Sequence, residues 1–130
     1  MNILDTDHCI AILRGQLDLR GHVSPDEELA TTTISVAELT HGANRSRNRE
    51  DNLARLEVLL STLTILPFDE PAAWRFGALK AGLESTGATL DNLDLQIASI
   101  AIEADAVLLT NNTKHFKRIN GLKLINWLAE

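Results

Sequence analysis

Short apolar runs alternate with longer amphipathic segments along this chain, a pattern that predicts strands connected by helices. The runs that we assign to strands lie at residues 2–5, 31–34, 62–66, 107–110 and 123–125. Each is only a few residues long and is bounded by polar or turn residues, as is typical of strands buried within a parallel sheet.

Between these runs, apolar residues recur at spacings of three and four, which predicts helices with one buried face. Shorter helices are predicted at about residues 7–13 and from Ser35 to Gly42, and Gly87 is expected to end a longer one. The predicted apolar faces of the three other helices are Leu53, Leu56, Leu60 and Leu63; Ala72, Phe76, Leu79 and Leu83; and Leu93, Ile97, Ile100 and Ala101. Strands that alternate with helices predict an α/β domain with a central, mainly parallel sheet of four to five strands.

Length and composition are those of one ordinary globular domain. The 130 residues suffice for a single core, so we expect one domain spanning 1–130. The single cysteine, Cys9, excludes an internal disulfide framework and fits a reducing compartment. The chain starts directly in an apolar strand and contains no apolar run of the roughly 20 residues that span a bilayer. We therefore expect a cytoplasmic protein without a signal peptide or membrane contact.

The net charge of −6 weighs against a simple nucleic-acid-binding protein, which usually has a basic surface. Two facts reduce this objection. Basic residues are grouped at 45–49 and 114–118, and a bound divalent metal would cancel part of the acidic charge. The sequence does not place either basic group beside the acids.

Acidic residues occur where the predicted parallel sheet would bring them to one edge. Asp5 ends the first strand, Glu38 lies in the helix after the second, and Asp94 lies at the start of the helix near residue 92. In open parallel sheets, ligands bind outside the carboxyl ends of the strands. Carboxylates gathered there commonly hold Mg²⁺ or Mn²⁺ for phosphate chemistry.

Each acid also has a simpler explanation as a helix cap. Ser35 and Glu38 have the spacing of a capping box, and Asp91 and Asp94 are a weaker version of it. Asp5 is likewise suited to cap the first helix. Taken one at a time, capping is the simpler explanation; the occurrence of all of them at one predicted edge favours a metal site.

Other chemistries find little support. The four histidines show no pairing typical of zinc sites, and no glycine-rich phosphate loop is present. Cys9 lies among apolar residues and is expected in the core, and Trp74 and Trp127 are expected to be packing residues.

Four segments, in order, resemble the PIN-domain ribonucleases, and more narrowly the VapC toxins of type II toxin–antitoxin (VapBC) pairs. The segments are Ile3-Leu4-Asp5-Thr6-Asp7, Ser35-Val36-Ala37-Glu38-Leu39, Asp94-Leu95-Gln96-Ile97-Ala98 and Leu109-Thr110-Asn111-Asn112. The resemblance covers nearly the whole chain and implies a PIN-like three-layer α/β/α domain.

The resemblance implies a Mg²⁺-dependent endoribonuclease, with Mn²⁺ as a substitute, in which Asp5, Glu38 and Asp94 are the catalytic and metal-binding acids. It further implies a homodimer, a VapB-like antitoxin that covers the acidic pocket, and a structured RNA substrate: a tRNA, and most closely the initiator tRNA. Asp91 is a possible accessory acid.

Asn112 and Thr6 are accessory candidates for positioning phosphate or water by hydrogen bonds. The chain departs from the family pattern at Asp7, where Asn is usual, and at Asn112, where many PIN domains have a fourth acid. These departures leave open the role of Asp7 and the number of metal ions.

Two other functions remain to be weighed. Asp5-x-Asp7 after the first strand resembles the acid pair of HAD-like phosphatases, but Glu130 is the only acid after Thr110, so later acidic residues of that mechanism are missing. A non-catalytic interaction module, whose acids only cap helices, is the more serious alternative. It predicts no dependence on a divalent metal.

Overall fold

The computed structural model describes residues 1–128, so residues 129 and 130 of the predicted single domain lie outside it. In chain order, the elements are β1 (Asn2–Leu4), α1 (Thr6–Leu13), the 3₁₀ helix η1 (Leu19–Gly21), β2 (Leu29–Thr32), α2 (Thr33–Arg45), α3 (Arg49–Ser61), β3 (Thr64–Leu66), α4 (Glu70–Ser85), α5 (Asn92–Glu103), β4 (Val107–Leu109), α6 (Thr113–Phe116) and β5 (Lys123–Ile125). The predicted α/β class is confirmed, and all five predicted strands are present.

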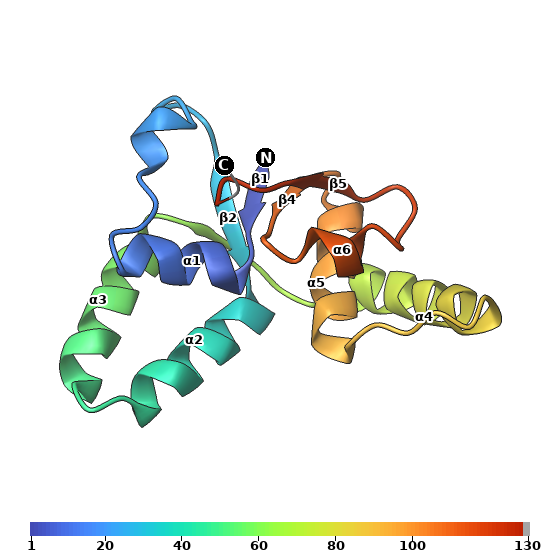
Figure 1. The fold of residues 1–130 in the computed structure, drawn as a ribbon, viewed down its shortest axis with the longest axis horizontal. Helices are drawn as coiled ribbons and strands as arrows, with labels where there is room; N and C mark the ends of the chain where they lie inside the picture. The colour runs from blue at the N-terminus through green and yellow to red at the C-terminus, as the bar shows by residue number, and fades with distance from the viewer. Residues whose placement is uncertain (129–130) are drawn as a thin grey trace.

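The five strands form one sheet in the order β3-β2-β1-β4-β5, and every neighbouring pair is parallel. Helices α1, α2 and α3 lie on one side of the sheet, and α4, α5 and α6 lie on the other (Figure 1). The order reverses at β1, because β2 and β3 are added on one side of it and β4 and β5 on the other. The gap between the carboxyl ends of β1 and β4 is therefore the position where doubly wound sheets bind ligands.

Alternate side chains of the central strands β1 and β4 point into two hydrophobic cores, one on each side of the sheet. Ile3 and Leu108 point into the core that contains the apolar faces of α4 and α5, together with the fully buried Phe116. Leu4 and Leu109 point into the opposite core against α1, α2 and α3. A strand that is buried on both faces has no polar position within it, which explains the continuous apolar runs in the sequence.

The start of α2 differs from its prediction. Strand β2 ends at Thr32 and the helix begins at Thr33, so Thr32 is the N-cap residue and its hydroxyl accepts a hydrogen bond from the Ser35 N–H at 3.1 Å. The predicted capping box of Ser35 and Glu38 is therefore wrong. Each of the three consecutive threonines at 31–33 is able to cap a helix, and the packing of β2 places Thr32 at the N-cap position of α2. As a consequence, Glu38 is not needed to cap α2.

Several predicted packing positions are also wrong. Leu93 is 43% exposed and Trp74 is 77% exposed, so neither is a core residue. In α3, Leu59 is buried although it was not among the predicted core residues, while the predicted Leu60 is partly buried against the same core. The end of α4 is confirmed, because Gly87 has a φ of 75°, a conformation that favours glycine. No helix within residues 1–128 combines the length and apolar character needed to cross a membrane.

Candidate active site

The site begins where β1 and β4 end side by side. The Asp5 N–H donates to the carbonyl oxygen of Leu109 at 2.9 Å, which extends the ladder by one residue and fixes Asp5 at the edge of the sheet. Thr110 follows β4 directly and is fully buried. Two polar residues from opposite ends of the chain thus meet at the reversal of strand order.

Asp5 is a buried carboxylate with two hydrogen bonds. Its Oδ1 accepts from the Thr6 N–H at 2.8 Å, which caps α1, and its Oδ2 accepts from the Thr110 hydroxyl at 2.7 Å. Burial at 6% exposure raises the pKa of Asp5 to about 6, against the stabilising effect of these donors, and the charges of Asp7 and Asp94 raise it further. The fold therefore holds Asp5 where negative charge is costly unless a cation is near.

Glu38 reaches the same edge from α2. Its Oε1 lies 2.8 Å from the Thr6 hydroxyl, which is itself 2.9 Å from the hydroxyl of Ser35. Ser35 is able to donate to Thr6 while Thr6 donates to Glu38, because a hydroxyl is both donor and acceptor. Thr6 thus positions a candidate acid, and its predicted role in positioning phosphate or water stays a prediction.

Asp94 lies in the first turn of α5, and Asp91 is the N-cap of that helix. The Asp91 side chain accepts from the Leu93 N–H at 2.8 Å, as its capping explanation predicts. Burial raises the pKa of Asp94, and the negative charges of Asp91 and Glu38 raise it further, while His115 acts in the opposite direction. These mutual effects mean that the predicted acids form one electrostatic cluster. Asp94 enters it from a helix that precedes β4, not from the end of a strand.

A polar cavity of about 660 Å³ adjoins this cluster. Glu38, Asp91 and Asp94 line it together with Asn112, the residue that precedes α6. Two members of the second basic group, His115 and Arg118, line it as well.

A family model for the PIN domain matches residues 3–122. The chain belongs to the PIN-domain family. It is 36% identical over 129 residues to ribonuclease VapC2 of Rickettsia felis, with 96% of each chain covered, and 32% identical over 130 residues to the tRNA(fMet)-specific endonuclease VapC of Salmonella typhimurium, again with 96% of each covered. Similar solved structures include VapBC2 of Rickettsia felis bound to a promoter DNA fragment (TM-score 0.89, 35% identity, 97% of this chain and 98% of that chain) and DNA-bound VapBC of Salmonella typhimurium (TM-score 0.90, 31% identity, 97% of both chains). The predicted resemblance is thus confirmed, and within the family the chain groups with VapC proteins.

Asp7, where this PIN domain departs from the family pattern, has three polar partners. Its Oδ2 accepts from the Asn111 N–H at 2.9 Å, and its Oδ1 accepts from Nδ1 of the fully buried His8 at 2.7 Å. The Trp127 N–H donates to the other ring nitrogen of His8 at 3.1 Å, so that nitrogen is an acceptor and the proton is on Nδ1. The Oδ2 atom also lies 3.3 Å from the Thr110 hydroxyl. This pairing was not predicted from the sequence, although the adjacent Asp7 and His8 were a signal for it.

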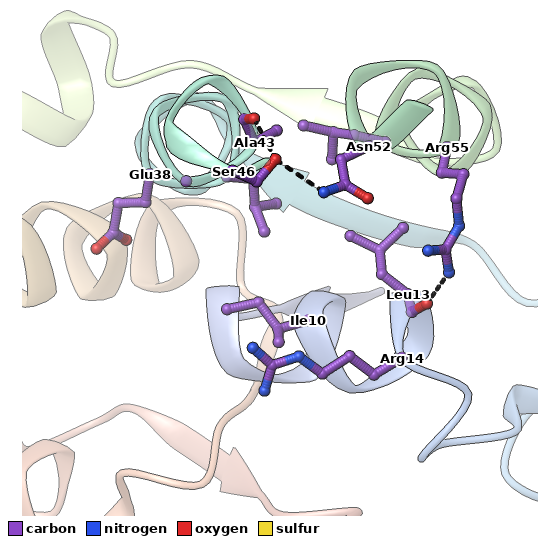
Figure 2. Close-up of a pocket in the computed structure, with 11 residues that line it drawn as sticks. Ile10, Leu13, Arg14, Glu38, Ala43, Ser46, Asn52 and Arg55 are labelled. Carbon is purple, nitrogen blue, oxygen red and sulfur yellow. Dashed lines mark hydrogen bonds between the residues drawn. The ribbon is translucent and has the colours of Figure 1, made fainter. Parts of the chain in front are cut away.

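A second, more apolar hollow of about 290 Å³ lies between α1, α2 and α3 of the PIN domain. Ile10 and Leu13 of α1 line it from one side and Ala43 of α2 from another, with Glu38 at one end and Arg55 at the other (Figure 2). The side chain of Arg55 donates to the carbonyl oxygen of Leu13, which ties α3 to the end of α1. Glu38 lines both cavities, so the hollow and the acidic cavity adjoin at this residue.

The donor set of this PIN domain suits a hard divalent cation, because its side chains offer carboxylate and amide oxygens and no thiolate. Burial and neighbouring negative charges raise the pKa values of both Asp5 and Asp94, so a cation at this edge would favour their ionised forms. Within residues 1–128, however, no three acidic, histidine or cysteine side chains are close enough to hold one ion together. The fold gathers the predicted acids at one edge without bringing three of them to one point.

Proposed function

We propose that this protein is a Mg²⁺-dependent endoribonuclease toxin of a type II toxin–antitoxin pair. The observation that carries the proposal is the convergence of Asp5, Glu38 and Asp94, from three separate segments, beside the reversal of strand order. Helix capping explains Asp5 and Asp91, and the dipole of α5 favours an acid at Asp94, but neither gives a reason for Glu38 to be there. The names of the VapC relatives add support for RNA as the substrate.

In this mechanism, Asp5 and Asp94 would hold the cation, and Glu38 would either join them or orient the attacking water. When bound, Mg²⁺ supplies positive charge that favours the ionised acids and stabilises the negative charge developing on the phosphate. The Thr110 hydroxyl keeps the Asp5 carboxylate in one rotamer, and Thr6 holds Oε1 of Glu38, which leaves Oε2 available to the water. Preorganised partners of this kind reduce the rearrangement needed during reaction.

The substrate that we propose is a tRNA, with the initiator tRNA as the first to be tested. Support comes from the relatives of Shigella flexneri and Salmonella typhimurium, which are named tRNA(fMet)-specific endonucleases and are 30% and 32% identical to this chain.

The partner that we propose is a VapB-like antitoxin, whose segment would occupy the hollow between α1, α2 and α3 and reach the acidic site at Glu38. The hollow has the apolar walls that such a segment requires, and it shares the lining residue Glu38 with the acidic cavity. Several solved relatives are toxin–antitoxin complexes. A homodimer, implied by the family resemblance, stays a prediction that light scattering of the purified protein would test.

Cleavage of total tRNA by purified, antitoxin-free protein tests the proposal. We expect discrete fragments with Mg²⁺ or Mn²⁺, none with EDTA, and none from Asp94→Asn. The matched control is Asp26→Asn, which removes the same charge from an exposed acid in the loop before β2. Metal-independent cleavage, or equal activity of Asp94→Asn and Asp26→Asn, would refute the assigned site. A protein that cleaves neither tRNA nor ribosomal RNA would instead support the non-catalytic interaction module.

A further inference from the structure

The polar cavity beside the acids contains cationic and apolar groups that the cleavage mechanism does not use. Besides Glu38, Asp91 and Asp94, its lining includes His115, Arg118 and the apolar residues Leu90 and Leu93. A site that served only to hold a cation would need carboxylates alone. The added residues suit a larger ligand that has both negative charge and an apolar surface.

Arg118 is fixed in place at this cavity by one backbone contact. Its Nη1 donates to the carbonyl oxygen of Thr89 at 2.7 Å, which joins the turn after α6 to the loop before α5. A guanidinium has five N–H donors, so this contact leaves four. Among the ion pairs of residues 1–128, none includes Arg118. The fold thus holds an anchored positive charge near several acids without pairing it with any of them.

Electrostatics explains why a nuclease of net charge −6 needs such a residue. A phosphodiester that approaches the acidic cluster is repelled, and a nearby cation that does not belong to the reaction offsets this repulsion. Only the second basic group contributes to this cavity, through His115 and Arg118; Lys114 and Lys117 do not line it. His115 lies close enough to Asp94 to affect its ionisation, so both basic residues lie near the acids.

The exposed apolar residue Leu93 completes the argument. It is 43% exposed and occupies the first turn of α5, directly beside Asp94 in the sequence. Apolar and aromatic surfaces beside a phosphate site contact the faces of unstacked bases, which is how proteins commonly hold single-stranded RNA. The cavity volume of about 660 Å³ lies within the usual range for small-ligand sites.

We infer that this cavity binds the nucleotide next to the scissile phosphate, with Arg118 and His115 donating to its phosphodiester oxygens and Leu93 contacting its base. The inference rests on the proposed ribonuclease function and adds to it a substrate class: an unpaired, unstacked nucleotide, as found in RNA loops. Arg118 binds the substrate equally in the ground and transition states, so it lowers KM and leaves kcat unchanged.

Steady-state cleavage of an initiator tRNA transcript by three variants tests this role. Arg118→Gln should raise KM by about 10- to 100-fold with kcat within about 2-fold, in line with a hydrogen bond to a charged group. Arg118→Lys should recover part of the loss, because it restores the charge. Lys117→Gln is the matched control: it removes one charge from the adjacent residue, which does not line the cavity, and should change KM by less than about 2-fold.

Salt dependence separates phosphate binding from a structural role of Arg118. Each phosphate contact on a single strand contributes about 0.7 to the slope of log affinity against log salt concentration, so Arg118→Gln should lower that slope by about this amount. A residue that only secured the loop at Thr89 would instead lower kcat and the melting temperature without changing the slope. Leu93→Ser should weaken binding at an unchanged slope.

Binding measured in an Asp5→Asn background keeps this inference distinct from the proposed function. Fluorescence anisotropy with a labelled single-stranded oligouridylate reads affinity without cleavage. If the wild type cleaves RNA but Arg118→Gln leaves KM, affinity and salt slope unchanged, the nucleotide site is refuted and the ribonuclease stands. If the Asp5→Asn protein shows Arg118-dependent binding while the wild type cleaves no RNA, the proposed function fails and the RNA-binding cavity stands.

Discussion

Asp5→Asn should stabilise the fold in the absence of metal while abolishing cleavage. The folded protein raises the pKa of Asp5 from 3.8 to about 6, chiefly because it is buried. At about 1.4 kcal/mol per pKa unit, this shift means that the ionised carboxylate costs the native state about 3 kcal/mol. An asparagine carries no charge and avoids this cost.

The asparagine can also keep the existing hydrogen bonds. Its oxygen can accept from the Thr6 N–H, and its amide can donate to the Thr110 hydroxyl. The hydroxyl proton of Thr110 then turns to Oδ2 of Asp7, which already lies 3.3 Å away. The loss of one charge-assisted bond offsets part of the gain, so we expect a net stabilisation of about 1–3 kcal/mol.

The assay is urea unfolding in EDTA between pH 4 and pH 7.5. Below pH 3.8, Asp5 is protonated in both the native and the unfolded state and costs nothing. As pH rises from 3.8 to about 6, the unfolded state loses this proton first, so the wild type loses stability relative to Asp5→Asn; above pH 6 the difference is constant. The free energy of unfolding of Asp26→Asn should follow the wild type throughout.

Adding Mg²⁺ should reverse the order of stability, because only the wild type retains the full set of acids to bind it. The reasoning is refuted if Asp5→Asn is the less stable protein at pH 7 in EDTA, or if the difference does not change with pH. A melting temperature of the wild type that does not respond to Mg²⁺ would argue against the metal site alone.

Three further substitutions test neighbouring contacts. Thr110→Val removes the donor that lowers the pKa of Asp5, so the acidic limb of the pH–rate profile should move to higher pH; an unmoved limb would show that this bond does not control the acid. Asp7→Ala leaves the buried Nδ1–H of His8 without its partner and should cost about 1–3 kcal/mol in urea unfolding, whereas an unchanged midpoint would mean that water replaces the carboxylate. Phe116→Ala empties a fully buried position and should cost about 3–5 kcal/mol, and a loss below 1 kcal/mol would contradict its place in the core.

The alternation of strands and helices could be predicted from the sequence because local patterns encode it. All five strands were located; the central strands β1 and β4 have the apolar runs that a strand buried on both faces needs, whereas the edge strands β3 and β5 are largely exposed. The candidate acids could be predicted for a related reason: in a parallel sheet, the helix starts and the strand ends lie at one edge, so Asp5, Glu38 and Asp94 had to be near one another.

Helix boundaries and exposure depended on contacts that the local pattern does not contain. The capping box at Ser35 and Glu38 was wrong because the preceding threonines offered an equivalent cap, and the pairing of β2 with β1 and β3 selected Thr32. Leu93 and Trp74 are as apolar as core residues, but the neighbouring elements do not cover them.

Only the tertiary structure decided which distant residues share a hydrogen bond or a cavity. Thr110 meets Asp5 across 105 positions of sequence, and Trp127 meets His8 across 119. Arg118 reaches the acidic site while Lys117 does not, although the two are adjacent in the chain. The sequence by itself determined the alternation of strands and helices and the edge at which chemistry would occur, because both follow from local periodicity and parallel strand direction. The protonation, anchoring and charge balance of that edge were decided by packing, because they depend on burial and on contacts between residues far apart in the chain.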